Sequence, residues 1–153
     1  MAEKGKFILP KLHHVGIAVK DVEAAAEYYY SNFGIGPFMI FDVDLPDVVI
    51  LRQRTRLKLK VGIGQMGDIY LELVQALEEG SPAWELVYRR GEGLYHLRFL
   101  VDDLSQALAQ LEKQGFKGLE SAGKGKNRFA FVGSRKSEGV LLELMQLESD
   151  LIS

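Results

Sequence analysis

The chain has 153 residues, of which 47% are hydrophobic and 26% are charged, and its formal net charge is −2. This length predicts one domain, and the near-neutral charge predicts no binding to nucleic acid. The lack of cysteine excludes disulfides, thiolate catalysis and cysteine-ligated metal sites. The sequence has no apolar run long enough for a membrane span or a signal peptide, so we expect a cytoplasmic protein that does not bind membranes.

The first expected strand, residues 12–19, begins with two histidines in the stretch LHHVGIAVKD. Apolar residues then recur at helical spacing over 22–33, with Asp21 as a plausible N-cap. The same reasoning places the remaining elements, in chain order, as strands at 38–45, 49–54, 57–65 and 68–75, a helix at 82–90, a strand at 94–101, a helix at 104–114, and strands at 127–132 and 139–147.

The sequence repeats itself. A shift of 82 residues places His14 on His96 and Asp21 on Asp103, and the stretches IYLELVQ (69–75) and VLLELMQ (140–146) align at a shift of 71. Each half therefore reads as a β-α-β-β-β module, the first over about 10–76 and the second over about 93–148. We expect an α+β fold in which these two tandem modules form one domain over residues 1–153.

Duplication also pairs the residues that could carry chemistry, because equivalent positions of two related modules converge on one cleft. The pairs are His14 with His96 and Glu72 with Glu143, and each glutamate stands between two leucines. Two imidazoles and two carboxylates suit a divalent ion of borderline hardness. Four protein ligands would leave two octahedral positions open for water or substrate, as in a catalytic site. His13 has no counterpart in the second module, and by strand alternation it should face away as a structural or surface residue.

These motifs resemble the vicinal oxygen chelate (glyoxalase/bleomycin resistance) superfamily, the group of glyoxalase I, methylmalonyl-CoA epimerase and extradiol dioxygenases. The resemblance covers about residues 10–148 and is closest to methylmalonyl-CoA epimerase in IYLELVQALEEGSPAWELVYRRGEGLYHLRFLVDDL. It implies a curved mixed sheet around a metal cleft and a homodimer. It also implies one divalent metal ion (Co, Mn, Ni, Zn or Mg) held by His14, Glu72, His96 and Glu143, with Glu143 a candidate for moving the substrate proton.

The resemblance implies a metal-dependent isomerase that removes a proton next to a chelated carbonyl and epimerises methylmalonyl-CoA or a related acyl-CoA. The substrate would then be a small molecule, a thioester. The family also uses an acidic residue after the first helix, for which FDVDLPD offers Asp42, Asp44 and Asp47, and we assign Asp44 as the second catalytic acid. Two alternatives remain: a glyoxalase I-like lactoylglutathione lyase, whose substrate is a glutathione hemithioacetal, and a non-catalytic small-molecule binding protein of the resistance type.

Two departures from the epimerase pattern bear on the substrate. Gly133, Ser134 and Arg135 replace a His-Pro-Lys run before the last strand, and Arg98 stands where a small or apolar residue is usual. Strand alternation puts Arg98 on the same face as His96. Its guanidinium could therefore bind a substrate carboxylate through two parallel hydrogen bonds. Alternatively, it could lie at the rim of the cleft and pair with a surface acid.

Overall fold

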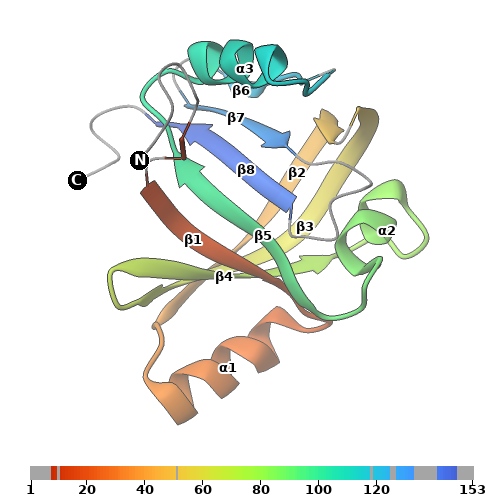
Figure 1. Ribbon diagram of the computed structural model, residues 1–153. Coiled ribbons are helices and arrows are strands. Elements are labelled where there is room, and N and C mark those ends of the chain that lie inside the picture. Colours follow the sequence, from red (N-terminus) through yellow and green to blue (C-terminus); the bar gives the residue numbers. More distant parts are fainter. Residues whose placement is uncertain are drawn as a thin grey trace.

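The computed structural model describes residues 8–9, 11–50, 52–117, 119–124, 127–132 and 141–147. Two central strands, β1 and β5, each lead into a helix and further strands (Figure 1). In chain order the elements are β1 (Lys11–Ala18), α1 (Val22–Phe33), β2 (Phe38–Ile50), β3 (Gln53–Met66), β4 (Ile69–Ala76), α2 (Pro82–Tyr88), β5 (Gly93–Leu100), α3 (Leu104–Lys113), β6 (Ala122–Lys124), β7 (Asn127–Val132) and β8 (Leu141–Gln146).

One mixed sheet holds all of the described strands in the order β2-β3-β4-β1-β5-β8-β7-β6. Each module contributes one parallel pair, β1 with β4 and β5 with β8, and the other ladders are antiparallel. The sheet curves until β2 contacts β7, so it is nearly closed (Figure 1). The expected α+β fold of two β-α-β-β-β halves is confirmed.

The prediction of a separate strand at 49–54 is wrong. Strand β2 continues to Ile50, the chain turns there, and β3 begins at Gln53, so three strands follow α1 as in the second module. Pro46 suggests a break in the sequence, but an edge strand tolerates proline, and a register shift between Leu45 and Val48 absorbs the irregularity. The short strand β6 was not expected, and of the strand expected at 139–147 the structure describes Leu141–Gln146.

Each module fastens the start of its helix in the same way. The N-cap aspartates Asp21 and Asp103 each accept a hydrogen bond, at 3.0 Å, from the backbone N–H three residues further on. Gln75 of β4 accepts from the first N–H of α1 at 3.0 Å, and Gln146 of β8 accepts from the first N–H of α3 at 2.8 Å. These glutamines satisfy donors that a helix start leaves unpaired, so the duplicated LELxQ pattern ties each helix to its own last strand.

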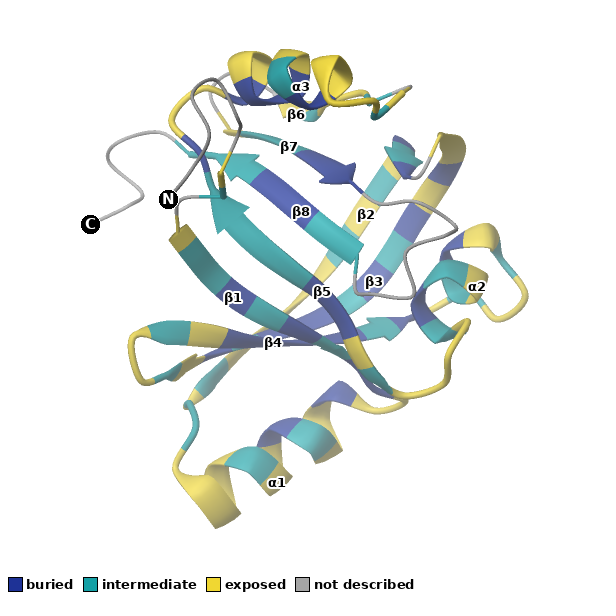
Figure 2. Ribbon diagram, viewed as in Figure 1, coloured by how far each residue is buried: buried dark blue, intermediate teal, exposed yellow. Residues whose placement is uncertain are grey.

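The two longer helices cover the outer face of the curved sheet. Leu71 and Leu73 of β4 pack with Val22 of α1, and Leu144 of β8 packs with Leu104 of α3. Both helices carry buried positions along part of their length and exposed positions along the rest (Figure 2). Since side chains alternate along a strand, the glutamate between the leucines of each strand faces the inner side. The fold thus turns both glutamates towards the concave interior. No helix within the described residues is long and apolar enough to cross a membrane.

Candidate metal centre

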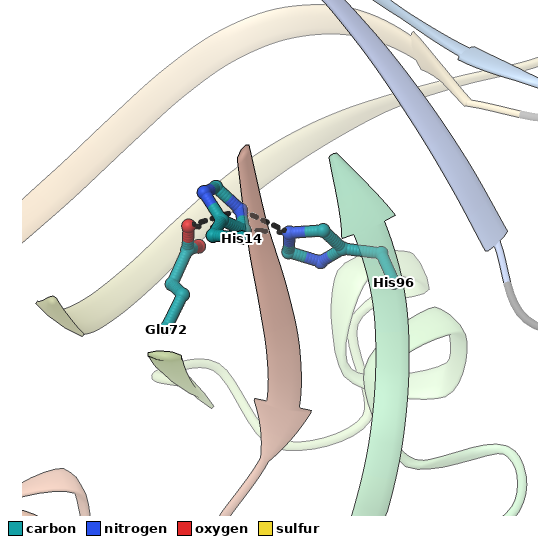
Figure 3. A group of neighbouring side chains, drawn as sticks. All are labelled: His14, Glu72 and His96. Carbon is teal, nitrogen blue, oxygen red and sulfur yellow. Dashed lines mark hydrogen bonds and ion pairs between the residues drawn. The ribbon is translucent and has the colours of Figure 1, made fainter. Parts of the chain in front are cut away.

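Three side chains from different strands meet on the inner face of the sheet. His14 of β1, Glu72 of β4 and His96 of β5 are 0%, 6% and 2% exposed. Nε2 of His14 lies 2.8 Å from Nε2 of His96 and 2.7 Å from Oε2 of Glu72, and that oxygen lies 3.9 Å from Nε2 of His96 (Figure 3). We call these three residues the His–Glu–His cluster.

The sheet register explains why the cluster forms. Gly16 of β1 pairs with Glu72 of β4 on one side and with His96 of β5 on the other, and His14 lies two residues earlier on the same face. The second module repeats this arrangement, because Arg98 of β5 lies between His14 of β1 and Glu143 of β8. The two modules thus present equivalent residues across the β1–β5 ladder.

Burial holds both imidazoles of the cluster in the form that binds metals. Desolvation lowers the pKa of His14 to about 2, and the positive charge of Arg98 acts in the same direction. Desolvation also lowers the pKa of His96, although the carboxylates of Glu143 and Glu72 oppose this shift. Both rings are therefore neutral near pH 7, and a neutral imidazole nitrogen is a metal ligand.

The cluster fits a divalent ion. The Nδ1 atom of His14 lies 3.2 Å from Nδ1 of His13, and when His14 carries its proton there, its Nε2 presents a lone pair towards Nε2 of His96 and Oε2 of Glu72. Within the described residues Oε2 of Glu72 accepts no hydrogen bond. Two neutral imidazole nitrogens and a carboxylate oxygen are donor types that Zn²⁺ and similar divalent ions accept. Lone pairs at these distances repel unless a proton or a metal cation lies between them.

His13 has a contact that strand alternation did not predict. We expected its side chain to face away from the site, yet its ring reaches Nδ1 of His14 and packs on Tyr70 at 5.1 Å between ring centroids. Metal-binding histidines commonly use their other ring nitrogen in such a hydrogen bond, which fixes the tautomer and the ring orientation. Alternation gives the direction of a Cβ atom and not the reach of the ring beyond it.

Glu143 and Arg98 form an ion pair at the border of the cluster. The Glu143 side chain is buried, with Oε2 3.4 Å from Nε2 of His96 and Oε1 3.0 Å from the Arg98 guanidinium, which also lies 3.9 Å from Oε2 of Glu72. Burial alone would lower the pKa of Arg98, but these two carboxylates outweigh it and raise the pKa. Arg98 thus pairs with buried acids of the site itself, and not with a surface acid.

The structure does not bring Asp44 to the cluster. Alternation along β2 turns Val43 and Leu45 inwards and Asp44 outwards, where Arg56 donates two hydrogen bonds to its carboxylate at 2.9 and 2.7 Å. The hydrogen bonds from Arg56 lower the pKa of Asp44. Asp42 and Asp47 are exposed as well. The segment Gly133, Ser134 and Arg135 lies outside the described residues.

Gly16 is a site residue that the sequence did not reveal as such. A Cβ atom at this position would overlap the ring of His96, at 2.6 Å from Nδ1 and 2.8 Å from Nε2. The imidazole of His96 therefore lies across β1 only because position 16 has no side chain. A glycine inside a strand can indicate such a close approach, and this was the available signal.

The cluster opens onto a cavity of about 280 Å³ enclosed by the curved sheet. Glu72, His96, Arg98 and Glu143 line it together with apolar side chains from five strands. Tyr95 also lines it, and burial raises the pKa of its phenol, so that the hydroxyl stays protonated. A small molecule in this cavity would contact the neutral imidazole of His96 and both carboxylates.

Comparison with known proteins gives consistent matches. Residues 13–131 match the family model described as the Glyoxalase/Bleomycin resistance protein/Dioxygenase superfamily. The uncharacterised protein YqjC of Bacillus subtilis is 30% identical over 92% of this chain and 94% of its own length. An ethylmalonyl-CoA/methylmalonyl-CoA epimerase of Cereibacter sphaeroides is 29% identical over 92% of this chain and 100% of its own length. A variant of the Streptomyces coelicolor methylmalonyl-CoA epimerase, solved with 2-nitronate-propionyl-CoA, has a TM-score of 0.62 and 26% identity over 93% of this chain and 97% of that one.

Proposed function

The chain belongs to the glyoxalase/bleomycin resistance/dioxygenase superfamily, and on that premise we propose that it is a metal-dependent isomerase of acyl-CoA thioesters. The reaction removes a proton from the carbon next to the thioester carbonyl and returns it on the opposite face. Methylmalonyl-CoA and related acyl-CoAs are the substrates that this proposal covers.

The observation that carries the proposal is the buried His–Glu–His cluster beside the cavity. His14, Glu72 and His96 would hold a divalent ion, with Glu143 as a further ligand or a neighbouring base. When bound, such an ion supplies a Lewis acid that polarises a carbonyl oxygen and stabilises the negative charge developing there. The apolar walls exclude water and strengthen these electrostatic interactions.

Glu143 is the proposed proton carrier. Arg98 engages its Oε1 atom and leaves Oε2 directed towards His96, so the carboxylate is fixed in the cavity wall. The C–H bond next to the carbonyl breaks, its proton passes to the carboxylate, and its electron pair delocalises towards the carbonyl oxygen. Asp44 faces outwards and is bonded to Arg56, so we do not propose it as the second proton carrier.

The relatives support a CoA thioester as substrate. The Cereibacter sphaeroides relative is named an epimerase of ethylmalonyl-CoA and methylmalonyl-CoA, and the Streptomyces coelicolor enzyme was solved with an acyl-CoA analogue. A glyoxalase I-like lyase would use the same ligand types, and it differs in taking a glutathione hemithioacetal. A non-catalytic binder is disfavoured because it has no need of buried metal ligands.

Hydrogen exchange tests the proposal. The metal-loaded protein is incubated with methylmalonyl-CoA and with other 2-substituted acyl-CoAs in deuterated water, and mass spectrometry follows deuterium at the carbon next to the thioester. We expect incorporation with at least one thioester and none after chelation. Turnover of a glutathione hemithioacetal with no exchange in any acyl-CoA would move the assignment to the lyase, and activity towards neither class would favour the binder.

A further inference from the structure

A β-bulge in β5 turns the side chain of Tyr95 into the cavity. Gly16 of β1 pairs with His96 of β5 and Ile17 pairs with Leu94, so Tyr95 has no partner on β1. An extra residue of this kind bends its strand and changes the direction of a side chain. Regular alternation would place Tyr95 and His96 on opposite faces of the sheet, yet both line the cavity. The bulge therefore adds a phenol to the wall beside a residue of the His–Glu–His cluster.

The Tyr95 hydroxyl is buried without a protein partner. The residue is 9% exposed, and within the described part of the chain its hydroxyl takes part in no hydrogen bond. Tyr88 shows the usual arrangement, because its hydroxyl donates to the carbonyl oxygen of Val19 at 2.7 Å and accepts from the N–H of Ala76 at 3.2 Å. A buried tyrosine hydroxyl normally has such a partner, because an unpaired one is costly. The free hydroxyl of Tyr95 thus indicates a partner that the cavity receives from outside.

The phenol lies close to the point at which a substrate oxygen would meet the cluster. The rings of Tyr95 and His96 are 5.0 Å apart between centroids, edge to face. His96 and Glu72 are the members of the cluster that line the cavity. A carbonyl oxygen held at the cluster would therefore lie near the wall that carries the phenol. A phenol donates one hydrogen bond, and a carbonyl oxygen accepts it.

Resting on the isomerase function proposed above, we infer that Tyr95 is a further catalytic residue, whose O–H donates a hydrogen bond to the thioester carbonyl oxygen of the acyl-CoA. This bond strengthens as proton removal places negative charge on that oxygen, so it stabilises the transition state more than the bound substrate. Tyr95 keeps its own proton throughout. The proton of the C–H bond passes to Glu143, the electron pair moves towards the carbonyl oxygen, and no oxidant or other reactant is needed.

Isotope-edited infrared spectroscopy tests the hydrogen bond without catalysis. Propionyl-CoA labelled at the thioester carbonyl is bound to metal-loaded protein, and the labelled stretch is read against the unlabelled compound. A hydrogen bond weakens the carbonyl bond, so we expect a lower frequency in the wild type than in Tyr95→Phe. Tyr30→Phe loses the same hydroxyl at a position that is 51% exposed, and it should give the wild-type frequency. Equal frequencies in the wild type and folded Tyr95→Phe, or a wild type that does not bind propionyl-CoA, would overturn the inference.

Stability separates a catalytic hydroxyl from a structural one. Tyr95→Phe keeps the ring and removes a hydroxyl that has no partner in the described part of the chain, so urea unfolding should show no loss of stability. A clear loss would mean that the hydroxyl has a structural role, and it would overturn the inference. If the variant does not fold at all, the same conclusion holds.

Kinetics then separate this inference from the isomerase proposal. The deuterium assay uses the acyl-CoA that the wild type exchanges fastest, and metal content is measured in each variant. Removing one such donor commonly costs about 10²- to 10³-fold in kcat, and we expect Tyr95→Phe to lose kcat in that range with its KM and bound metal nearly unchanged. Exchange by Tyr95→Phe at the wild-type rate would overturn the inference and leave the isomerase proposal intact. If the infrared difference is present while the wild type exchanges no acyl-CoA, the isomerase proposal fails and the hydrogen bond from Tyr95 stands.

Discussion

Gly16 and His96 face each other across the β1–β5 ladder, and the imidazole of His96 occupies the space that a side chain at position 16 would need. Position 98 is the equivalent of position 16 in the second module, and there Arg98 fills the space and engages Glu143. The two halves of the site therefore differ at this position. The glycine side brings the donor atoms of His14, Glu72 and His96 together, and the arginine side holds one carboxylate in a fixed orientation.

Gly16→Ala should displace His96. Crowding of a packed interior costs about 1–3 kcal/mol of the free energy of unfolding. We also expect divalent-ion affinity to fall at least tenfold, measured by calorimetric titration with Mn²⁺. Gly62→Ala is the control, because its Cβ would meet Cγ1 of Val22 at 3.0 Å, away from the cluster, and metal affinity should not change. Wild-type affinity in Gly16→Ala would contradict the role of Gly16.

Glu143→Gln should abolish proton exchange while the fold is retained. The amide has the shape of the carboxylate and can still accept a hydrogen bond from Arg98, but it cannot take up the substrate proton. General bases commonly contribute about 10²- to 10⁴-fold, and we expect a loss in that range in the deuterium assay. Asp44→Asn makes the same chemical change on the outer face and should exchange at the wild-type rate. Exchange by Glu143→Gln at that rate would refute its role as base.

Arg98→Leu should destabilise the metal-free protein, because it leaves Glu72 and Glu143 buried without their cation. Removing one partner of a buried ion pair typically costs about 3–5 kcal/mol, and urea unfolding measures this loss. Changing Glu143 to Gln in the same chain should recover part of it, since one buried charge is removed. If Arg98→Leu is as stable as the wild type, the guanidinium does not compensate the buried carboxylates.

Acid should destabilise the metal-free protein. Burial lowers the pKa of His14 to about 2 and also lowers that of His96, from an ordinary value of 6.5. As the pH falls below 6.5, the unfolded chain takes up protons that the folded protein does not bind, so stability falls by up to about 1.4 kcal/mol per pH unit for each histidine. Urea unfolding at pH 7.5 and pH 5.5 should show this loss, and a double His14→Asn, His96→Asn variant should show less of it. Equal stability of the wild type at the two pH values would contradict the prediction that both histidines are buried in their neutral form.

The sequence predicted the fold because it contains the fold twice. The shifts of 82 and 71 residues aligned the two modules, and the alternation in LELVQ and LELMQ already implied glutamates opposite the leucines that the helices cover. Proximity of the duplicated residues followed from the duplication alone, without any coordinates.

Other features depend on contacts between segments that one sequence cannot align. Asp42 and Asp44 occur in the same strand pattern, and only the register of β2 with β3 shows that Asp44 is bonded to Arg56 on the outside. The hydrogen bond of His13 to its neighbour depends on a ring rotation, and the overlap at Gly16 depends on the β1–β5 register. The spacing of residues along the sequence does not predict any of these contacts.

The metal-to-protein ratio tests the central claim most directly. The protein is purified without chelators and its metal content is measured by inductively coupled plasma mass spectrometry, before and after titration with Mn²⁺, Co²⁺ and Zn²⁺. We predict one tightly held divalent ion per chain in the wild type and its loss in Glu72→Gln and His96→Gln, with circular dichroism showing that both variants remain folded. A wild-type protein that binds none of these ions, or folded variants that keep its full metal content, would contradict the assignment of the His–Glu–His cluster as a metal centre.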